Sequence, residues 1–340
     1  MRPKKILIIR IDGIGDLLCV TPTLKAVRQQ FPNARIDFLA NLGPHIVLDG
    51  NSDINRLVID YRSKVGGSRL RGLAYLPRRF SEWVRRNLFG YDLVVVAHYG
   101  MHHRAMAIAC ATKCSKILAN VEPKHQSSIT DPRLTLADYR PGTHEVEGVF
   151  ETIRPLVGHE LAGRMWVFPK LDSLHYPDGW NTARPGLVIG INLSASVEER
   201  RWATAKFIAL IQSLALRYPT ASFTITGLPA DVENFKALSR TLEQPINQLF
   251  YFSTPSLASY IAAINVCTLY ISIEGGGVHL ASALAIPQVA LFQKTKIARW
   301  RPWSVPHRVV ISATDEDKIG QINPEQVIEA TSALLTELGY

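Results

Sequence analysis

The sequence predicts an α/β protein made of two doubly wound domains that face a central cleft. Two observations predict this class. Short β-rich runs alternate with helical patterns through both halves of the chain, which is typical of parallel sheets covered by helices. In each half, an apolar strand also ends at a glycine-containing turn, and a helical pattern begins directly after it.

The first half, residues 1–165, is expected to form an N-terminal Rossmann-like domain. Its first strand, 5–11, is a continuous apolar and β-branched run, as found in strands that are buried on both faces of a sheet. The first helix is expected at 17–30. Further strands are expected at 35–40, 56–60, 92–97 and 116–119.

The second half begins after an expected linker, residues 166–185, which has several prolines and weak periodicity. It is expected to form a second Rossmann-like domain, 186–325, and a closing C-terminal helix, 326–340. Its strands are expected at 186–193, 222–226, 248–252, 268–273, 288–292 and 307–312. Its helices are expected at 204–217, 231–241, 256–264 and 278–285.

Composition indicates a cytosolic protein. No apolar run approaches the 18 or so residues of a membrane-spanning helix, and no signal peptide is expected. The cysteines are scattered and read as reduced thiols. Cys110 and Cys114 could share a helical face, but they lack a second ligand pair for zinc.

The formal net charge of +9 is concentrated in one segment. Residues 60–90 contain eight lysines and arginines against two acids, interleaved with aliphatic and aromatic side chains. This pattern suits an anionic membrane surface or an anionic glycolipid, and a solvated loop and helix is the alternative. Arg62 and Lys64 are therefore candidate acceptor-binding residues. No nucleic-acid-binding motif is present, so nucleic acid is not an expected partner.

The most informative turn contains three consecutive glycines, Gly275, Gly276 and Gly277, between an apolar strand and a helical pattern. Glycine lets an anionic ligand approach the backbone, and a helix start offers N–H groups without partners. The turn is therefore a candidate phosphate or pyrophosphate cradle, to which His279 could add a donor. A plain strand-to-helix turn with capping glycines is the alternative.

The first strand ends in a similar turn, which contains Gly13, Gly15 and Asp16. The third glycine of a dinucleotide-binding G-x-G-x-x-G falls at Leu18, so the match to that fingerprint is weak. Asp16 stands at a helix start, at the carboxyl end of the first strand, where doubly wound sheets bind their ligands. A carboxylate there is either a helix cap or a general base.

Two further groups of polar residues follow predicted strands. Ser194, Ser196 and Arg200 come after the first strand of the second half, and hydroxyl and guanidinium groups can hold phosphate oxygens. His98 follows the strand at 92–97 and is expected to line the acceptor site. With His102 and His103 it lacks a nearby carboxylate in the sequence, so no metal site is expected.

Three blocks of this chain together resemble glycosyltransferase family 9, the ADP-heptose:lipopolysaccharide heptosyltransferases. They are Arg10 to Leu18 followed by Thr21-Pro22, the stretch Asn192 to Trp202, and Glu274 to Leu284 followed by Pro287 to Phe292. The resemblance spans the whole chain in order. It implies a GT-B architecture, with the acceptor on the N-terminal domain and the nucleotide-sugar on the C-terminal one.

The resemblance also implies roles for individual residues. Asp16 matches the family's catalytic carboxylate, with Gly15 beside it, and would take a proton from the acceptor hydroxyl as the anomeric centre inverts. Gly275, Gly276 and His279 match the diphosphate-holding turn. Because backbone N–H groups and cations would hold the leaving diphosphate, neither a metal nor another cofactor is expected.

The chain departs from the family pattern at three donor-site positions. Glu274 replaces an aspartate, Gly275 replaces a threonine, and Arg200 replaces a lysine. These departures put the identity of the donor in question more than the fold.

The sequence thus leads to one main hypothesis. The protein is expected to be an inverting transferase that moves a heptose from ADP-heptose to a lipopolysaccharide-core acceptor, at the cytoplasmic face of the inner membrane. The alternatives are the same fold with another nucleotide-sugar donor, or a non-catalytic protein that binds membranes or polyanions.

Overall fold

The structure, a computed structural model, describes residues 2–60, 89–158, 161, 163–180, 186–192, 202–229, 232–242, 246, 248–312 and 317–340. The chain divides into two compact units, Met1–Phe168 and Pro169–Tyr340. We call them unit 1 and unit 2. Five of the candidate site residues lie outside the described residues, namely Arg62, Lys64, Ser194, Ser196 and Arg200.

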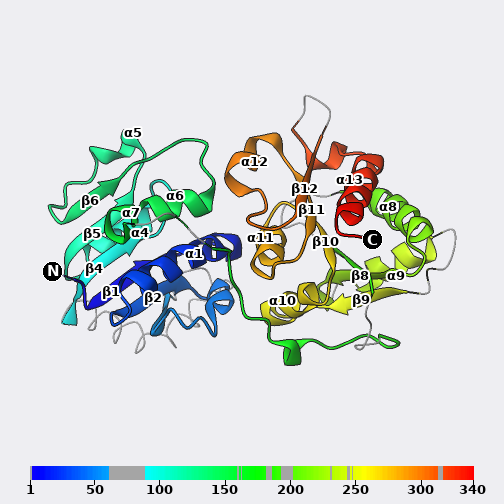
Figure 1. Ribbon diagram of the computed structural model, residues 1–340, viewed down its shortest axis with the longest axis horizontal. Helices are drawn as coiled ribbons and strands as arrows, with labels where there is room; N and C mark the ends of the chain where they lie inside the picture. Colours follow the sequence, from blue (N-terminus) through cyan, green and yellow to red (C-terminus); the bar gives the residue numbers. More distant parts are fainter. Residues whose placement is uncertain are drawn as a thin grey trace. The chain divides into compact units, whose positions relative to one another are not determined.

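Unit 1 contains a six-stranded parallel sheet in the order β3-β2-β1-β4-β5-β6 (Figure 1). The strands are β1 (Lys5–Ile9), β2 (Arg35–Asn41), β3 (Arg56–Asp60), β4 (Tyr91–Val96), β5 (Cys114–Asn120) and β6 (Leu134–Ala137). The chain order reverses between β1 and β4, which pair in parallel. In doubly wound sheets, this reversal point marks the crevice in which ligands bind.

Helices complete unit 1. They are α1 (Ile14–Gln30), η1 (Pro44–Leu48), α4 (His103–Cys110), α5 (Pro123–Gln126), α6 (Glu145–Glu151) and α7 (Arg154–Val157). Helix α1 packs against α6 and α7 (Figure 1). Leu7 and Ile9 of β1 share a core cluster with Ala105 and Ala109 of α4. The buried ends of β1 and β4 are thereby held against helices from distant parts of the sequence.

Unit 2 repeats the topology of unit 1. Its six parallel strands follow the order β12-β11-β10-β7-β8-β9, with the reversal between β7 and β10. The strands are β7 (Val188–Asn192), β8 (Ser222–Gly227), β9 (Leu249–Ser253), β10 (Leu269–Ile273), β11 (Gln288–Phe292) and β12 (His307–Ile311). The ends of β7 and β10 therefore correspond to the ends of β1 and β4 in unit 1.

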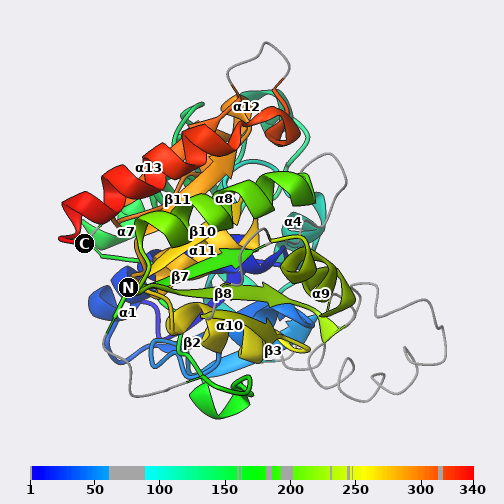
Figure 2. The same cartoon turned by 90° about the vertical axis from the view of Figure 1, so that its right-hand side faces the viewer.

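Helices cover both faces of the second sheet. They are η3 (Leu171–Ser173), α8 (Thr204–Arg217), α9 (Val232–Arg240), α10 (Leu257–Asn265), α11 (Gly276–Ala283), α12 (Lys294–Trp300), η6 (Ile319–Gln321) and α13 (Pro324–Glu337). Helices α8 and α13 lie side by side on one face (Figure 2), where Leu210 and Leu334 join the core of the sheet. Val278 of α11 and Phe292 belong to a separate cluster that includes α12.

The predicted α/β, GT-B class with two Rossmann-like units is confirmed, and several boundaries are corrected. Helix α1 begins at Ile14 and α11 at Gly276, in each case earlier than expected, because a glycine precedes each helix as its N-cap. The short edge strand β6 and helices α6, α7 and α12 were not expected. Cys110 ends α4 and Cys114 begins β5, so the two cysteines do not share a helical face.

Candidate active site

Asp16 lies in the first turn of α1, just beyond the carboxyl end of β1. Its Oδ2 accepts a hydrogen bond from the backbone N–H of Gly13 at 3.2 Å, and its Oδ1 contacts Nη2 of Arg10 at 2.6 Å. The side chain is 26% exposed. Gly15 precedes it in the same turn and is partly exposed. The carboxylate thus caps the helix, as one interpretation of the sequence expected, and it remains accessible to a ligand.

Arg10 fixes the position of the Asp16 carboxylate. Its guanidinium is almost fully buried and also contacts the buried Glu145 of α6 and the carbonyl oxygen of Ala97, each at 2.8 Å. Its Nε lies 3.0 Å from Oδ2 of Asp12. Burial alone would lower the pKa of Arg10, but the carboxylates of Glu145, Asp16 and Asp12 raise this pKa above its usual value. The positive charge of Arg10 is therefore permanent, and it is held in place by Asp16 together with Asp12 and Glu145.

Asp12 joins this network to two histidines. Nδ1 of His98 lies 3.0 Å from Oδ2 of Asp12, and Nε2 of His102 lies 3.2 Å from Oδ1. Burial and the charge of Arg10 lower the pKa of His98 to about 3, so its imidazole is neutral near pH 7. Burial raises the pKa of Asp12, but hydrogen bonds to His102 and His98 and the charge of Arg10 bring it well below its usual value.

The structure corrects the sequence analysis on these histidines. The expectation that they lack a nearby carboxylate is wrong, because the adjacent ends of β1 and β4 bring Asp12 against His98. His103 does not join the cluster, since its ring packs edge-on against His125 at 5.8 Å between centroids. His98 itself is buried and contacts Asp12 through Nδ1, and its role in lining an acceptor site stays a prediction.

In unit 2, the three glycines form the start of α11. Gly275 is the N-cap and has φ of +146°, in the region that favours glycine. A Cβ atom on Gly277 would lie 2.7 Å from the hydroxyl oxygen of Tyr260 and 3.6 Å from Nδ2 of Asn192. The turn therefore has no room for a side chain at this position. Gly276 is the first residue of the helix, where backbone N–H groups lack intrahelical acceptors.

Asn192 connects this turn to the second predicted donor loop. It ends β7, the neighbour of β10, and its side chain donates a hydrogen bond to the hydroxyl of Tyr260 at 3.1 Å. Asn192 is the last described residue before Ser194, Ser196 and Arg200, which lie outside the described part of the chain.

Glu274 and His279 flank the glycine turn, and both side chains are buried. A carboxylate oxygen of Glu274 accepts a hydrogen bond from the backbone N–H of Gln293 at 3.2 Å. The ring of His279 lies edge-on to Trp300 of α12, with 5.8 Å between the centroids. Glu274 thus ties the ends of β10 and β11 together, and His279 ties α11 to α12.

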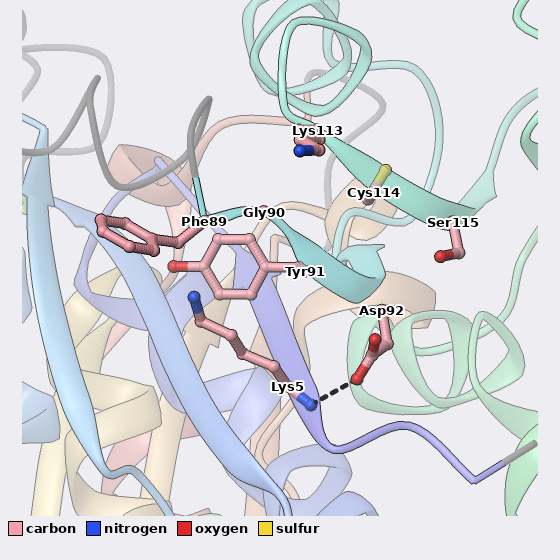
Figure 3. A pocket seen from close by; sticks show the side chains of 8 residues that line it. All are labelled: Lys5, Phe89, Gly90, Tyr91, Asp92, Lys113, Cys114 and Ser115. Carbon is pink, nitrogen blue, oxygen red and sulfur yellow. Dashed lines mark hydrogen bonds between the residues drawn. The ribbon is translucent and has the colours of Figure 1, made fainter.

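A cavity of about 220 Å³ lies at the amino ends of strands β1, β4 and β5 in unit 1, opposite the end that carries Asp16 (Figure 3). It adjoins the first residues of β1, β4 and β5, and Nζ of Lys5 lies 4.7 Å from the centre of the Tyr91 ring. Asp92 closes one side, because its Oδ2 accepts the backbone N–H groups of Lys4 and Lys5. Since ligands of doubly wound sheets bind at the carboxyl ends of strands, this cavity is not the candidate active site.

Residues 90–326 of this chain match the model of glycosyltransferase family 9 (heptosyltransferase). The chain belongs to this family. It is therefore a glycosyltransferase rather than a non-catalytic binding protein. Asp16 precedes the matched region, so its role is not supported by that match. None of the helices that the structure describes is long and apolar enough to cross a membrane.

Individual relatives align with this chain over nearly its whole length. Lipopolysaccharide heptosyltransferase 3 of Escherichia coli K12 is 25% identical, over 95% of this chain and 96% of its own. The crystal structure of a glycosyl transferase family 9 protein from Veillonella parvula has a TM-score of 0.74 at 19% identity, covering 98% of this chain and 97% of that one. The E. coli heptosyltransferase WaaC with ADP-2-deoxy-2-fluoro heptose has a TM-score of 0.71 at 15% identity, covering 98% and 99%.

Proposed function

We propose that this family 9 enzyme transfers a heptose from ADP-heptose to a lipopolysaccharide-core acceptor with inversion at the anomeric carbon. Unit 1 binds the acceptor and supplies Asp16 as the general base, and unit 2 binds the nucleotide-sugar. The relative that carries the name lipopolysaccharide heptosyltransferase 3 and the WaaC structure with an ADP-heptose analogue support this choice of substrates.

The observation that carries the proposal is the fixed carboxylate of Asp16. One oxygen bonds to Arg10 and the other to the backbone of Gly13, so the side chain is held in one orientation while part of it stays exposed. A carboxylate has about four lone-pair sites, which leaves each oxygen free to accept a further hydrogen bond. A substrate hydroxyl bonded there would lose its proton to Asp16 as its oxygen attacks the anomeric carbon.

The glycine turn of unit 2 supplies the other half of the reaction. The N–H groups at the start of α11 and the positive end of its dipole suit the diphosphate that leaves as the new glycosidic bond forms. A Cβ atom on Gly275 would meet open space, so the absence of a side chain there leaves room for the diphosphate to approach the backbone. Ser194, Ser196 and Arg200 follow Asn192 in the sequence and would add hydroxyl and guanidinium donors to the diphosphate.

The acceptor is expected to be an anionic glycolipid presented at the cytoplasmic face of the inner membrane. The support is the basic and aromatic composition of residues 60–90 together with the name of the lipopolysaccharide heptosyltransferase relative. Arg62 and Lys64 would contact acceptor phosphates in this proposal.

The test compares Asp16→Asn with Gly276→Val in transfer and ADP-binding assays. Asp16→Asn keeps the size of the side chain, but it cannot act as a base and it loses one of the two acceptor atoms that face Arg10 and Gly13, so transfer should fall by at least about 100-fold with ADP affinity unchanged. Gly276→Val should weaken ADP binding. Transfer at a near wild-type rate by Asp16→Asn would remove Asp16 as the base, and ADP binding unaffected by Gly276→Val would remove the glycine cradle.

A different nucleotide-sugar donor is the second candidate, and the conformation of Gly275 favours it. The family pattern has threonine at this position, whereas φ here is +146°, which a β-branched residue rarely adopts. The backbone in front of α11 is therefore suited to glycine and offers no hydroxyl to the ligand. Ranking the affinities for ADP, UDP and GDP decides between the donors, and a preference for UDP or GDP would exclude ADP-heptose.

A further inference from the structure

A chain of polar side chains lies beside the glycine turn of unit 2. Nδ2 of Asn192 donates a hydrogen bond to the hydroxyl of Tyr260 at 3.1 Å, and that hydroxyl lies 3.0 Å from the hydroxyl of Tyr270. The Tyr270 hydroxyl in turn lies 3.4 Å from Oγ1 of Thr226. These residues belong to β7, α10, β10 and β8, so the polar chain joins one helix to three strands that meet at the reversal point of the sheet.

The two phenols in this polar chain are neutral donors. Burial raises the pKa of Tyr260 to about 12 and the pKa of Tyr270 well above its usual value, so both hydroxyls keep their protons at neutral pH. Because Tyr260 accepts the amide N–H of Asn192, its own proton is available to Tyr270. The Tyr270 proton is available to Thr226 in the same way. Each phenol oxygen therefore has a partner on both sides, which fixes its position.

The Tyr260 hydroxyl touches the backbone of the glycine turn. A Cβ atom on Gly277 would lie 2.7 Å from this hydroxyl oxygen, which is closer than Cβ atoms approach other atoms in proteins. Nδ2 of Asn192 and a ring carbon of Tyr270 lie 3.6 Å from the same point. The side of Gly277 that would carry a side chain thus faces the polar chain, whereas a Cβ atom on Gly275 would meet open space. Glycine at position 277 therefore makes room for Tyr260.

This contact supports the first turn of α11. Helix α10, which carries Tyr260, packs against α11 (Figure 1). The N–H groups of Gly276 and Gly277 stand in the first turn, where they have no intrahelical acceptor, and their directions follow the backbone that Tyr260 contacts. N–H groups that are already aimed at an anion bind it more tightly, because they need no reorganisation.

We propose that Tyr260 is a positioning residue for the nucleotide-sugar: its hydroxyl, held between Asn192 and Tyr270, fixes the backbone N–H groups that receive the diphosphate. The inference rests on the proposed function of the glycine turn, and it adds a residue that acts through this turn. Its effect concerns the diphosphate and leaves the nucleoside and the acceptor unaffected.

The experiment compares Tyr260→Phe with the wild type in calorimetric titrations of the full chain with ADP and with adenosine. Phenylalanine keeps the ring and removes the oxygen that contacts the turn. Affinity for ADP should fall by about threefold to tenfold, the range expected for one hydrogen bond. Affinity for adenosine, which has no diphosphate, should stay unchanged. Wild-type affinity for ADP would overturn the proposal, and so would an equal loss for adenosine, since it would mean that unit 2 is loosened as a whole.

Tyr251→Phe is the matched control. The Tyr251 hydroxyl donates to the carbonyl oxygen of Leu228 and belongs to β9, at the edge of the same sheet. The variant loses one phenol hydroxyl from unit 2 without touching the turn, so it should bind ADP like the wild type. A loss as large as that of Tyr260→Phe would refute the proposal.

A double-mutant cycle tests whether Tyr260 acts through the turn. Gly277→Ala places a Cβ atom against the Tyr260 hydroxyl and should also weaken ADP binding. Because both substitutions change one contact, the double variant should bind ADP no more weakly than the weaker single variant. Losses that multiply would mean two independent effects and would contradict the proposal. If Tyr260→Phe does not fold, Tyr270→Phe replaces it, because it removes the inner partner of the Tyr260 hydroxyl; unchanged ADP affinity would then overturn the proposal.

The same titrations separate this inference from the proposed function. They use whichever of ADP, UDP and GDP the wild type binds most tightly, with the matching nucleoside. A preference for UDP or GDP would contradict ADP-heptose as the donor, while the comparison with Tyr260→Phe still tests the tyrosine. A loss in Gly276→Val without a loss in Tyr260→Phe would refute only the role of Tyr260. Unchanged affinity in both variants would remove the glycine cradle as well, and so would a wild type that binds none of the three nucleotides.

Discussion

Replacing Arg10 by methionine tests how much the buried ion network contributes to the stability of unit 1. Arg10 is 2% exposed and faces Glu145, which is fully buried, as well as Asp12 and Asp16. Methionine keeps much of the side-chain volume and removes the positive charge. The substitution therefore leaves three carboxylates together without the guanidinium that holds them.

The expected cost follows from this burial. Removing one partner of a buried ion pair typically destabilises a protein by about 3–5 kcal/mol, because the remaining charge stays desolvated. For a domain of the size of unit 1, this corresponds to a drop in melting temperature of about 10 °C. Adding Glu145→Gln to Arg10→Met should recover part of the loss, since it removes the most deeply buried of the three negative charges.

The assay is differential scanning calorimetry at fixed pH and salt, in a buffer with chelator. Arg308→Met is the matched control, because Arg308 pairs with Glu337 and both side chains are exposed, at 38% and 54%. An exposed pair contributes about 1 kcal/mol or less, so this variant should melt within about 3 °C of the wild type.

The reasoning would be refuted by similar melting temperatures for Arg10→Met and Arg308→Met. It would also fail if Glu145→Gln, placed on Arg10→Met, lowered the melting temperature further. Either result would mean that the stability of unit 1 does not depend on charge compensation at Arg10.

Three further predictions concern unit 2. Gly275→Ala should destabilise it by about 1–3 kcal/mol, because φ is +146°, and denaturant unfolding would measure the loss. Gly277→Ala should cost a similar amount, since its Cβ would lie 2.7 Å from the hydroxyl of Tyr260, and Tyr260→Phe should restore part of it; no recovery in the double variant would exclude this clash. Burial raises the pKa of Tyr260 to about 12, whereas tyrosine in the unfolded chain has a pKa near 10. Tyr260 therefore contributes up to about 3 kcal/mol to the free energy of unfolding below pH 10, and this contribution is lost between pH 10 and 12. Denaturant unfolding across this range should show a weaker decline in Tyr260→Phe than in the wild type.

Local patterns predicted most of the fold. Continuous apolar runs such as β1 and β11 are typical of buried parallel strands, and the glycine turns indicate where helices begin. Elements with weaker patterns were missed. Strand β6 is short and only partly buried at the sheet edge, and α6 has two glutamates in its first turn, which gives no amphipathic signal.

The candidate site was predictable only in part, for a physical reason. Asp16 and the glycines of unit 2 stand beside strand ends and are visible in the sequence. Glu145 lies 135 residues from Arg10, and nothing in its local sequence indicates a buried partner. Asp12 and His98 come together because β1 pairs with β4, a neighbour that is distant in the chain. Only the order of the strands reveals that contact.

The hydrogen bond from Gly13 to Asp16 has a consequence for comparing relatives of this enzyme. The carboxylate that is the proposed base also caps α1, and an acid at a helix start is favoured for stability alone. Selection for folding would therefore preserve an aspartate here in a descendant that had lost its activity. Degenerate copies of the enzyme should be recognised from decay of the glycine turn in unit 2 rather than from the loss of Asp16.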